Sequence, residues 1–263
     1  MLVGTVSGGH AGGCVCLARP VARYIAGMLS QSKTRLRAAV LLIGTCCFAA
    51  ACAGDAPSTD QNPVLKQAAP GLETPDVERT VVPGERFGPI QAATTEQDLV
   101  DAFGRGAVER AAIDIAEGET EPGTKLFGGT PDELDIVWIG DYACPKFVRS
   151  THEHSNWRLA NGIGVGTLLE DVEAANDTTF LMWGFEWDYG GYVESFETGR
   201  LTSLLLRFVV PFDWSDRVAQ ADLTRLSGNQ QIPSNDPLLR KLNPPLSEIG
   251  MAWPSDSPCA SRF

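Results

Sequence analysis

The pattern of apolar and polar residues divides the 263-residue chain into three parts. A mostly apolar run covers residues 38–51 and ends abruptly at Cys52. Residues 53–80 are then polar and rich in proline, with no helical or strand period, which is typical of a flexible tether. From residue 81 onward, short periodic stretches alternate with glycine and proline turn signals. We therefore expect a folded region of about 180 residues, long enough to bury a sizeable core.

The first periodic stretch predicts a short helix. Thr94 and Thr95 precede Glu, Gln and Asp at 96–98, an arrangement in which a hydroxyl accepts hydrogen bonds from free backbone N–H groups. Apolar residues follow at helical spacing, and Gly104 marks the end of the helix.

Two strands are predicted after this helix, at 107–115 and 134–139. The stretch between them, 117–132, is acidic and rich in glycine and proline. It predicts a long loop that contains one short strand.

The same helix signal recurs later in the chain. At an offset of 73 residues, Thr94 aligns with Thr167 and Asp98 with Asp171, without a gap. Two similar Thr-capped helices would produce this match by chance as well. Internal repeats decide architecture, however, so the match predicts two related modules.

The second copy continues into a stretch, 179–210, that predicts a three-stranded β-meander with turns at 188–191 and 197–199. The predicted fold class is therefore α+β, with two related helix-plus-antiparallel-sheet modules. The first module covers 81–155 and the second 156–210.

The last part, 211–263, predicts an amphipathic helix at 216–227 that uses Val218, Leu223 and Leu226. The remainder is rich in Pro and Ser. It predicts a tail with a single strand at 249–253.

The apolar run of residues 38–51 has the features of a secretory signal. Its 14 residues are too few to span a bilayer, which needs about 20. Basic residues precede it and small residues end it, as in signal peptides. Met28 would start a signal of ordinary length, so the signal region 1–51 is predicted to begin functionally at Met28.

The sequence Ala49-Ala50-Ala51-Cys52 resembles the lipobox of bacterial lipoproteins, although the family prefers Leu where Ala49 stands. The resemblance implies cleavage before Cys52 and lipidation of its thiol, with the tether 52–80 leading to the folded region. Two or more acyl chains hold a protein stably on a membrane. Two alternatives stay open: cleavage without lipid near Ala51, and lipidation at Cys46.

Lipidation implies a cell-envelope location. In lipoproteins an Asp directly after the cysteine favours retention at the inner membrane, and Ala53 stands there instead. The expected place is the outer membrane, facing the periplasm, if the host is Gram-negative. The membrane contact would be made by the lipid on Cys52.

Charge narrows the classes of partner. Residues 1–51 contain five basic and no acidic side chains, so the rest of the chain carries 16 basic and 33 acidic residues, a formal net charge of −17. This field repels phosphate backbones, and nucleic-acid binding is therefore not expected.

Two cysteines remain after Cys52, namely Cys144 and Cys259. In an oxidising compartment they are candidates for a disulfide, with two free thiols as the alternative. A bridge that closes a loop of this length would contribute about 4 to 5 kcal/mol in the chain-entropy model.

The most unusual composition lies in the meander. In an unbroken strand over 181–188, Trp183, Phe185 and Trp187 would share one face of the sheet. Such rings pack into a core or form a binding surface. The candidate binding surface consists of aromatic side chains and adjacent carboxylates: Trp183, Trp187, Tyr189, Tyr192, Glu186 and Asp188. We expect it to bind another envelope protein, the alternative being a small ligand or glycan held in a closed pocket.

Catalytic and metal-binding signals are weak. His152 and His154 would point to one side of a strand, which makes them weak metal candidates. The glycines of 162–167 fit a turn better than a phosphate loop. Ser195 has no nearby His, and a nucleophilic Cys144 with either histidine lacks support. No enzyme activity and no cofactor are expected.

Several motifs of the folded region carry a resemblance to a family of uncharacterised bacterial lipoproteins. They are Pro83-Gly84-Glu85, Gly88-Pro89-Ile90, Glu121-Pro122-Gly123-Thr124, Gly162-Ile163-Gly164 and Asp188-Tyr189-Gly190-Gly191. The module is more weakly similar to the repeat of β-lactamase inhibitor proteins and to SmpA/OmlA-type outer-membrane lipoproteins. These resemblances imply an α+β fold in the envelope and transfer no catalytic residue.

Overall fold

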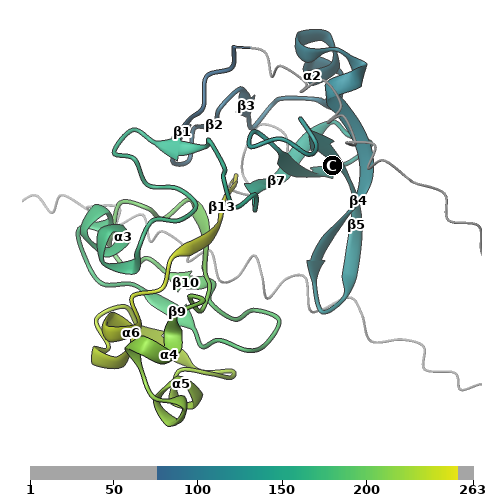
Figure 1. The fold of residues 1–263 in the computed structure, drawn as a ribbon. Helices are drawn as coiled ribbons and strands as arrows, with labels where there is room; N and C mark the ends of the chain where they lie inside the picture. The colour runs from purple at the N-terminus through teal and green to yellow at the C-terminus, as the bar shows by residue number, and fades with distance from the viewer. Residues whose placement is uncertain (1–75, 254–263) are drawn as a thin grey trace, which may run out of the picture.

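A computed structural model describes residues 76–253 (Figure 1). The predictions for the signal region, Cys52 and most of the tether fall on 1–75, outside the described residues. Cys259 lies in 254–263, which is likewise outside them. The described chain combines short helices with mostly antiparallel sheets, which confirms the α+β class.

The main element is a six-stranded sheet in the order β11-β13-β7-β6-β5-β4, antiparallel throughout. Its strands are β4 (Val108–Ala116), β5 (Glu119–Leu126), β6 (Leu134–Ile139), β7 (Cys144–Ser150), β11 (Leu204–Phe208) and β13 (Leu246–Ala252). β4 and β5 form a long hairpin that extends beyond the rest of the sheet (Figure 1).

Two smaller sheets flank it. One has the order β3-β2-β1-β8, from β1 (Thr80–Val82), β2 (Arg86–Phe87), β3 (Ile90–Gln91) and β8 (Arg158–Leu159). The other has the order β10-β9-β12, from β9 (Leu181–Trp183), β10 (Val193–Ser195) and β12 (Gln231–Pro233).

The helices are short. They are α2 (Glu96–Phe103), the 3-10 turn η1 (Arg105–Ala107), α3 (Leu169–Asn176), α4 (Trp214–Arg217), α5 (Gln220–Arg225) and α6 (Pro237–Leu242). The cap predicted for the first is confirmed: the Thr95 hydroxyl accepts from the Asp98 N–H, and the Asp98 carboxylate accepts from the Thr95 N–H. Within the described residues, no helix has the length and apolar character needed to span a membrane.

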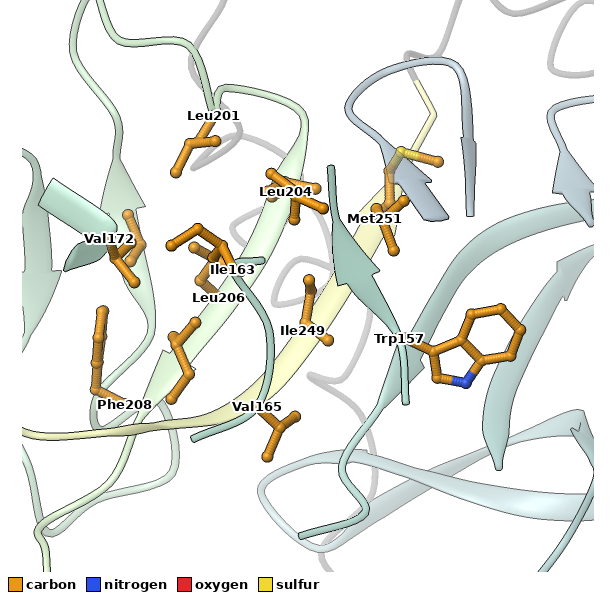
Figure 2. Close-up of a cluster of buried hydrophobic side chains, with 14 of the residues drawn as sticks. Trp157, Ile163, Val165, Val172, Leu201, Leu204, Leu206, Phe208, Ile249 and Met251 are labelled. Atoms are coloured by element: carbon orange, nitrogen blue, oxygen red, sulfur yellow. The ribbon is translucent and has the colours of Figure 1, made fainter. Parts of the chain in front are cut away.

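The core forms on one face of the large sheet. Leu204, Leu206 and Phe208 of β11 lie beside Ile249 and Met251 of β13 (Figure 2), and all five are nearly inaccessible to solvent. The same cluster includes side chains from α2, α3, α5 and α6, so a continuous core joins the helices to the sheet.

The predicted β-meander is confirmed for its first two strands, β9 and β10, and is wrong for the third. β11 pairs along its length with β13 in the large sheet, and it meets the preceding strand only at a bridge between Arg207 and Tyr192, the residue before β10. The third strand beside β9 is β12, from the part expected to be a tail. Apolar side chains on alternate positions of β11 are buried against the core, so this strand belongs to the sheet that carries the core.

This pairing also crosses the predicted module boundary. The large sheet takes β4 to β7 from the first module and β11 from the second, so the sheets do not separate into two modules. Two other expectations are corrected. Much of the acidic stretch 117–132 is strand β5, and 211–252 holds three short helices in place of one. The strand predicted at 249–253 is confirmed as part of β13, and a further strand, β12, lies in the stretch expected to be a loose tail.

Candidate functional site

Charged side chains of alternating sign form a row across all six strands on the second face of the large sheet, the face opposite the core. The row, from edge to edge, is Glu109, Lys125, Asp135, Arg149, Glu248 and Arg207. Most neighbours in the row are directly opposite each other in the strand register: Glu109 and Lys125, Lys125 and Asp135, Asp135 and Arg149, and Glu248 and Arg207. Glu248 and Arg149 are diagonal neighbours. Cross-strand neighbours of opposite charge stabilise a sheet, and this pattern also fixes the register.

The middle of this row is buried. Lys125 Nζ lies 2.6 Å from Asp135 Oδ1, and Arg149 lies 3.6 Å from both the Asp135 and Glu248 carboxylates. Arg149 Nη2 also donates to the backbone oxygen of Asp114 on β4. The contact shows that the sheet curls, because β5 and β6 lie between β4 and β7 in the strand order.

Tyr192 joins this row from the loop before β10. Its hydroxyl donates a 2.9 Å hydrogen bond to Glu248 Oε2, and the Arg207 guanidinium lies 5.0 Å from the centre of its ring. Burial, with Glu248 close by, raises the pKa of the Tyr192 hydroxyl. Burial also raises the pKa of Glu248, against the opposing effect of Arg149 and of the Tyr192 hydrogen bond.

The aromatic strip, formed by Trp183, Trp187 and Tyr189, lies at the end of β9 and in the loop after it. The Trp183 and Trp187 rings meet edge to face at 5.5 Å, and Trp187 and Tyr189 meet edge to face at 5.3 Å. All three side chains are half-buried. Each ring of the strip is therefore partly accessible to solvent.

Both indole N–H groups of the strip bond to the protein itself. Trp183 Nε1 donates to Glu194 Oε2 at 2.7 Å, and Trp187 Nε1 donates to the Gly184 backbone oxygen at 2.8 Å. These bonds fix the orientation of the rings. The accessible part of the strip is therefore apolar ring surface.

Carboxylates surround the strip. Glu186 and Asp188 are exposed, and neither takes part in an ion pair among the residues that the structure describes. Burial, with Glu117 and Asp188 close by, raises the pKa of the Tyr189 hydroxyl. Glu117 comes from the tip of the β4–β5 hairpin, so two distant parts of the chain contribute to this acidic border.

The strip differs from the surface predicted from the sequence. The strand is not unbroken: β9 ends at Trp183, and Phe185 turns into the core, where it is 3% exposed. The Gly184 N–H donates to the Gln230 oxygen, the Phe185 N–H donates to the Leu226 oxygen, and Glu186 has a φ of 64°. Phe185 therefore does not share a surface with the two tryptophans.

Tyr192 was also predicted on this surface, and the structure places it in the buried charged row. Of the six candidate residues, five lie together: Trp183, Trp187, Tyr189, Glu186 and Asp188. The Arg207 Nε–H, which donates to the Gly190 oxygen at 2.8 Å, connects the row to the strip loop.

The weak metal candidates do not form a site. His152 and His154 lie in a turn after β7, with ring centres 6.1 Å apart, and His154 faces Glu153 at 3.5 Å. No group of three metal-ligating side chains occurs in the part of the chain that the structure describes. The glycines of 162–167 form a turn, in which the Gly164 N–H donates to the Thr167 hydroxyl.

Two open hollows lie along helix α3. One, of about 690 Å³, is lined by the 162–167 turn and by Arg158 and Asp171. The other, of about 670 Å³, is lined by Glu170, Glu173 and Arg240 among others. Neither is lined by an aromatic residue.

Cys144 is disulfide-bonded, and its partner lies outside the described residues, because Cys144 is the only cysteine within them. The predicted bond to Cys259 stays a prediction.

No protein-family model matches this sequence, and comparisons with curated proteins and with solved structures give no significant match. The resemblance to bacterial lipoproteins stays a prediction as well.

Proposed function

We propose that this chain is a lipid-anchored protein of the cell envelope that binds a second envelope protein through the aromatic strip. One observation carries the proposal. Three half-buried rings contact one another edge to face, next to two exposed carboxylates that form no ion pair with described residues.

The chemistry of the strip fits a protein interface. Tryptophan and tyrosine supply a large share of binding energy where a partner can cover them. Because both indole N–H groups are already bonded within the chain, a partner gains ring surface without having to satisfy these donors. The rings are also held in place before binding, which lowers the entropy cost of association.

The charge around the strip selects the kind of partner. Glu186 and Asp188 flank the rings, Glu117 lies nearby, and the chain after residue 51 has a formal net charge of −17. A lysine or arginine placed over a ring face gains a cation–π contact and meets these carboxylates. The partner segment is therefore expected to be basic.

The alternative is a glycan or small ligand in a closed pocket lined by Trp183 or Trp187. The two hollows along α3 contain neither residue, and the rings of the strip are partly accessible to solvent. This arrangement favours a protein partner over an enclosed ligand.

A second exposed apolar surface provides the control residue for the binding experiment. Leu168, Val209 and Phe212 are exposed large apolar side chains, Phe212 being 105% exposed. Leu168 and Val209 both neighbour Pro245. Exposed carboxylates lie near this surface as well, Asp213 and Asp216 beside Phe212 among them, and the exposed aromatic ring makes Phe212 a matched control.

Site-directed photocrosslinking in cells tests the proposal. The full chain would carry the photoreactive analogue p-benzoylphenylalanine in place of Tyr189 or, separately, in place of Phe212. We expect a protein adduct from position 189 that disappears when Trp187→Ala is added. An adduct from position 212 alone would assign binding to the second surface, and the absence of a protein adduct from 189 would reject the proposal.

A further inference from the structure

The second face of the large sheet carries a small apolar patch beside the charged row. Its buried members are Ile113, Val137 and Phe147, at 1%, 0% and 6% exposure. Partly buried side chains of Ala111, Ile115, Leu205 and Ala252 surround them. All seven residues belong to strands of the same sheet, whereas a sheet buries a face against a second layer of structure.

Curling of the sheet covers one end of this patch. Arg149 on β7 reaches the backbone oxygen of Asp114 on β4, so the β4–β5 hairpin bends over the charged row. Ile113 also lies over Gly123, where a Cβ atom would meet the Ile113 side chain at 2.5 Å. These contacts cover the hairpin side of the patch, and the Arg149 guanidinium lies over the Phe147 ring, 5.8 Å from its centre. The remaining part of the patch lies toward Cys144 and β13.

Cys144 lies on that side and on the same face. Ile139 pairs with Cys144 and alternates along β6 with Trp138, whose side chain is in the main core. Paired residues share a face, so Cys144 lies on the face of Val137 and Phe147. The disulfide of Cys144 therefore ties a covalent partner to the edge of the patch.

The position of β13 points to the origin of that partner. Ala252, the last residue of β13, pairs with Phe147, and Cys144 lies three residues farther along β7, about 10 Å away. Cys259 follows Ala252 by seven residues, a reach of up to roughly 24 Å. The other five cysteines occur at or before Cys52, in the predicted signal region and lipidation site.

We propose that the segment 254–263 covers the β7–β13 side of the apolar patch, held there by a disulfide between Cys259 and Cys144. The segment supplies the second layer that the described strands lack at this place. Its apolar and proline residues fit a covering segment that lies across a sheet without extending it. This cover is independent of what the aromatic strip binds.

Two measurements on the full chain test this proposal. Peptide mapping without reductant is expected to yield one linked peptide pair that contains Cys144 and Cys259. In Cys259→Ser, backbone amide exchange at Val137 and Phe147 is expected to accelerate by about tenfold, because loss of the bond frees the covering segment. Ser261→Ala, in the same segment, is the matched control and should leave the exchange unchanged.

Three results would overturn it. A peptide map that links Cys144 to a different cysteine would contradict the proposal. A dimer joined through Cys144 on a non-reducing gel would contradict it as well. A correct Cys144–Cys259 link with unchanged exchange in Cys259→Ser would show that the segment does not cover the patch. If Cys259→Ser fails to fold, gentle reduction of the folded wild-type protein followed by the same exchange measurement gives the answer instead.

Discussion

The Tyr192 hydroxyl donates a 2.9 Å hydrogen bond to the Glu248 carboxylate and so ties the loop of the aromatic strip to an interior strand of the large sheet. Glu248 is 3% exposed, and Arg149 lies 3.6 Å from it on the next strand. The strip is thus anchored in the buried charged row. This contact separates two roles among neighbouring aromatic residues: Tyr192 bonds to the charged row, whereas Trp183, Trp187 and Tyr189 contact one another.

Tyr192→Phe should therefore reduce stability and leave binding intact. Removing the hydroxyl leaves a buried carboxylate short of one donor, which typically costs about 1 to 3 kcal/mol. Denaturant unfolding measures this loss, and Tyr189→Phe at the half-buried strip is the control. Equal unfolding free energies for the two variants would contradict the assignment of Tyr192 to the buried row.

Two buried glutamates should give opposite pH dependence. Burial disfavours the charged form of Glu96, but hydrogen bonds from Arg110 and Thr124 and the charge of Arg110 outweigh this effect and lower the pKa of the carboxyl, whereas burial raises the pKa of Glu248. Stability rises with pH wherever the unfolded state binds more protons. The stability from Glu96 is then present above its ordinary pKa of 4.5 and is lost as pH falls through the folded value.

For Glu248 the sign is reversed. Its folded pKa lies above the ordinary 4.5, so stability is greatest below 4.5 and declines as pH rises through the folded value. Thermal melts of Glu96→Gln and Glu248→Gln, recorded from acidic to neutral pH, test both pH dependences. The stability deficit of Glu96→Gln should grow as pH rises toward 4.5 and above, while Glu248→Gln should gain relative to wild type. The same trend in both variants would contradict these environments.

The loop of the strip also depends on one glycine. Gly191 has a φ of 82°, and a Cβ atom there would meet the Phe208 backbone oxygen at 1.9 Å. Gly162 has a similar φ of 89° but no atom within 4 Å of such a Cβ. Gly162→Ala should cost about 1 kcal/mol through backbone strain alone.

Gly191→Ala should cost clearly more, because the clash also breaks the bond between Phe208 N–H and the Gly191 oxygen. Unfolding free energies of the two variants give the comparison. Equal losses would show that close approach to β11 is not what requires glycine at 191.

Anchoring should depend on Cys52. The lipobox resemblance predicts that Cys52→Ser leaves the protein unlipidated and releases it from the membrane, since a lipid supplies the attachment. Cell fractionation and the intact mass of the purified protein measure this change, and Cys46→Ser is the control. If Cys46→Ser releases the protein from the membrane and Cys52→Ser does not, the lipid is attached to Cys46 instead.

The sequence allowed local features to be predicted better than distant pairings. The Thr95–Asp98 cap was foreseen because the two residues are three positions apart and act on their own backbone. The partner of β11 was not, because Leu204–Phe208 pairs with residues about forty positions later, and alternation on one strand names no partner. The charged row has the same origin: its members come from six strands, and only the register brings them together.

The candidate site was predicted in part for similar reasons. Trp183, Trp187 and Tyr189 stand out by composition. That Phe185 turns inward depends on hydrogen bonds to backbone oxygens at 226 and 230, and that the Tyr192 hydroxyl joins the charged row depends on Glu248, 56 positions away. No local pattern distinguishes these two rings from their neighbours.

The affinity of Trp187→Ala for the partner captured at position 189 tests the central claim most directly. Purified wild type, Trp187→Ala and Phe212→Ala would each be titrated against that partner, after thermal melts have shown that all three are folded. We predict that Trp187→Ala weakens the Kd by at least about tenfold, as the loss of a central interface aromatic typically does, while Phe212→Ala leaves it unchanged. An unchanged Kd for a folded Trp187→Ala would contradict the strip as the binding surface.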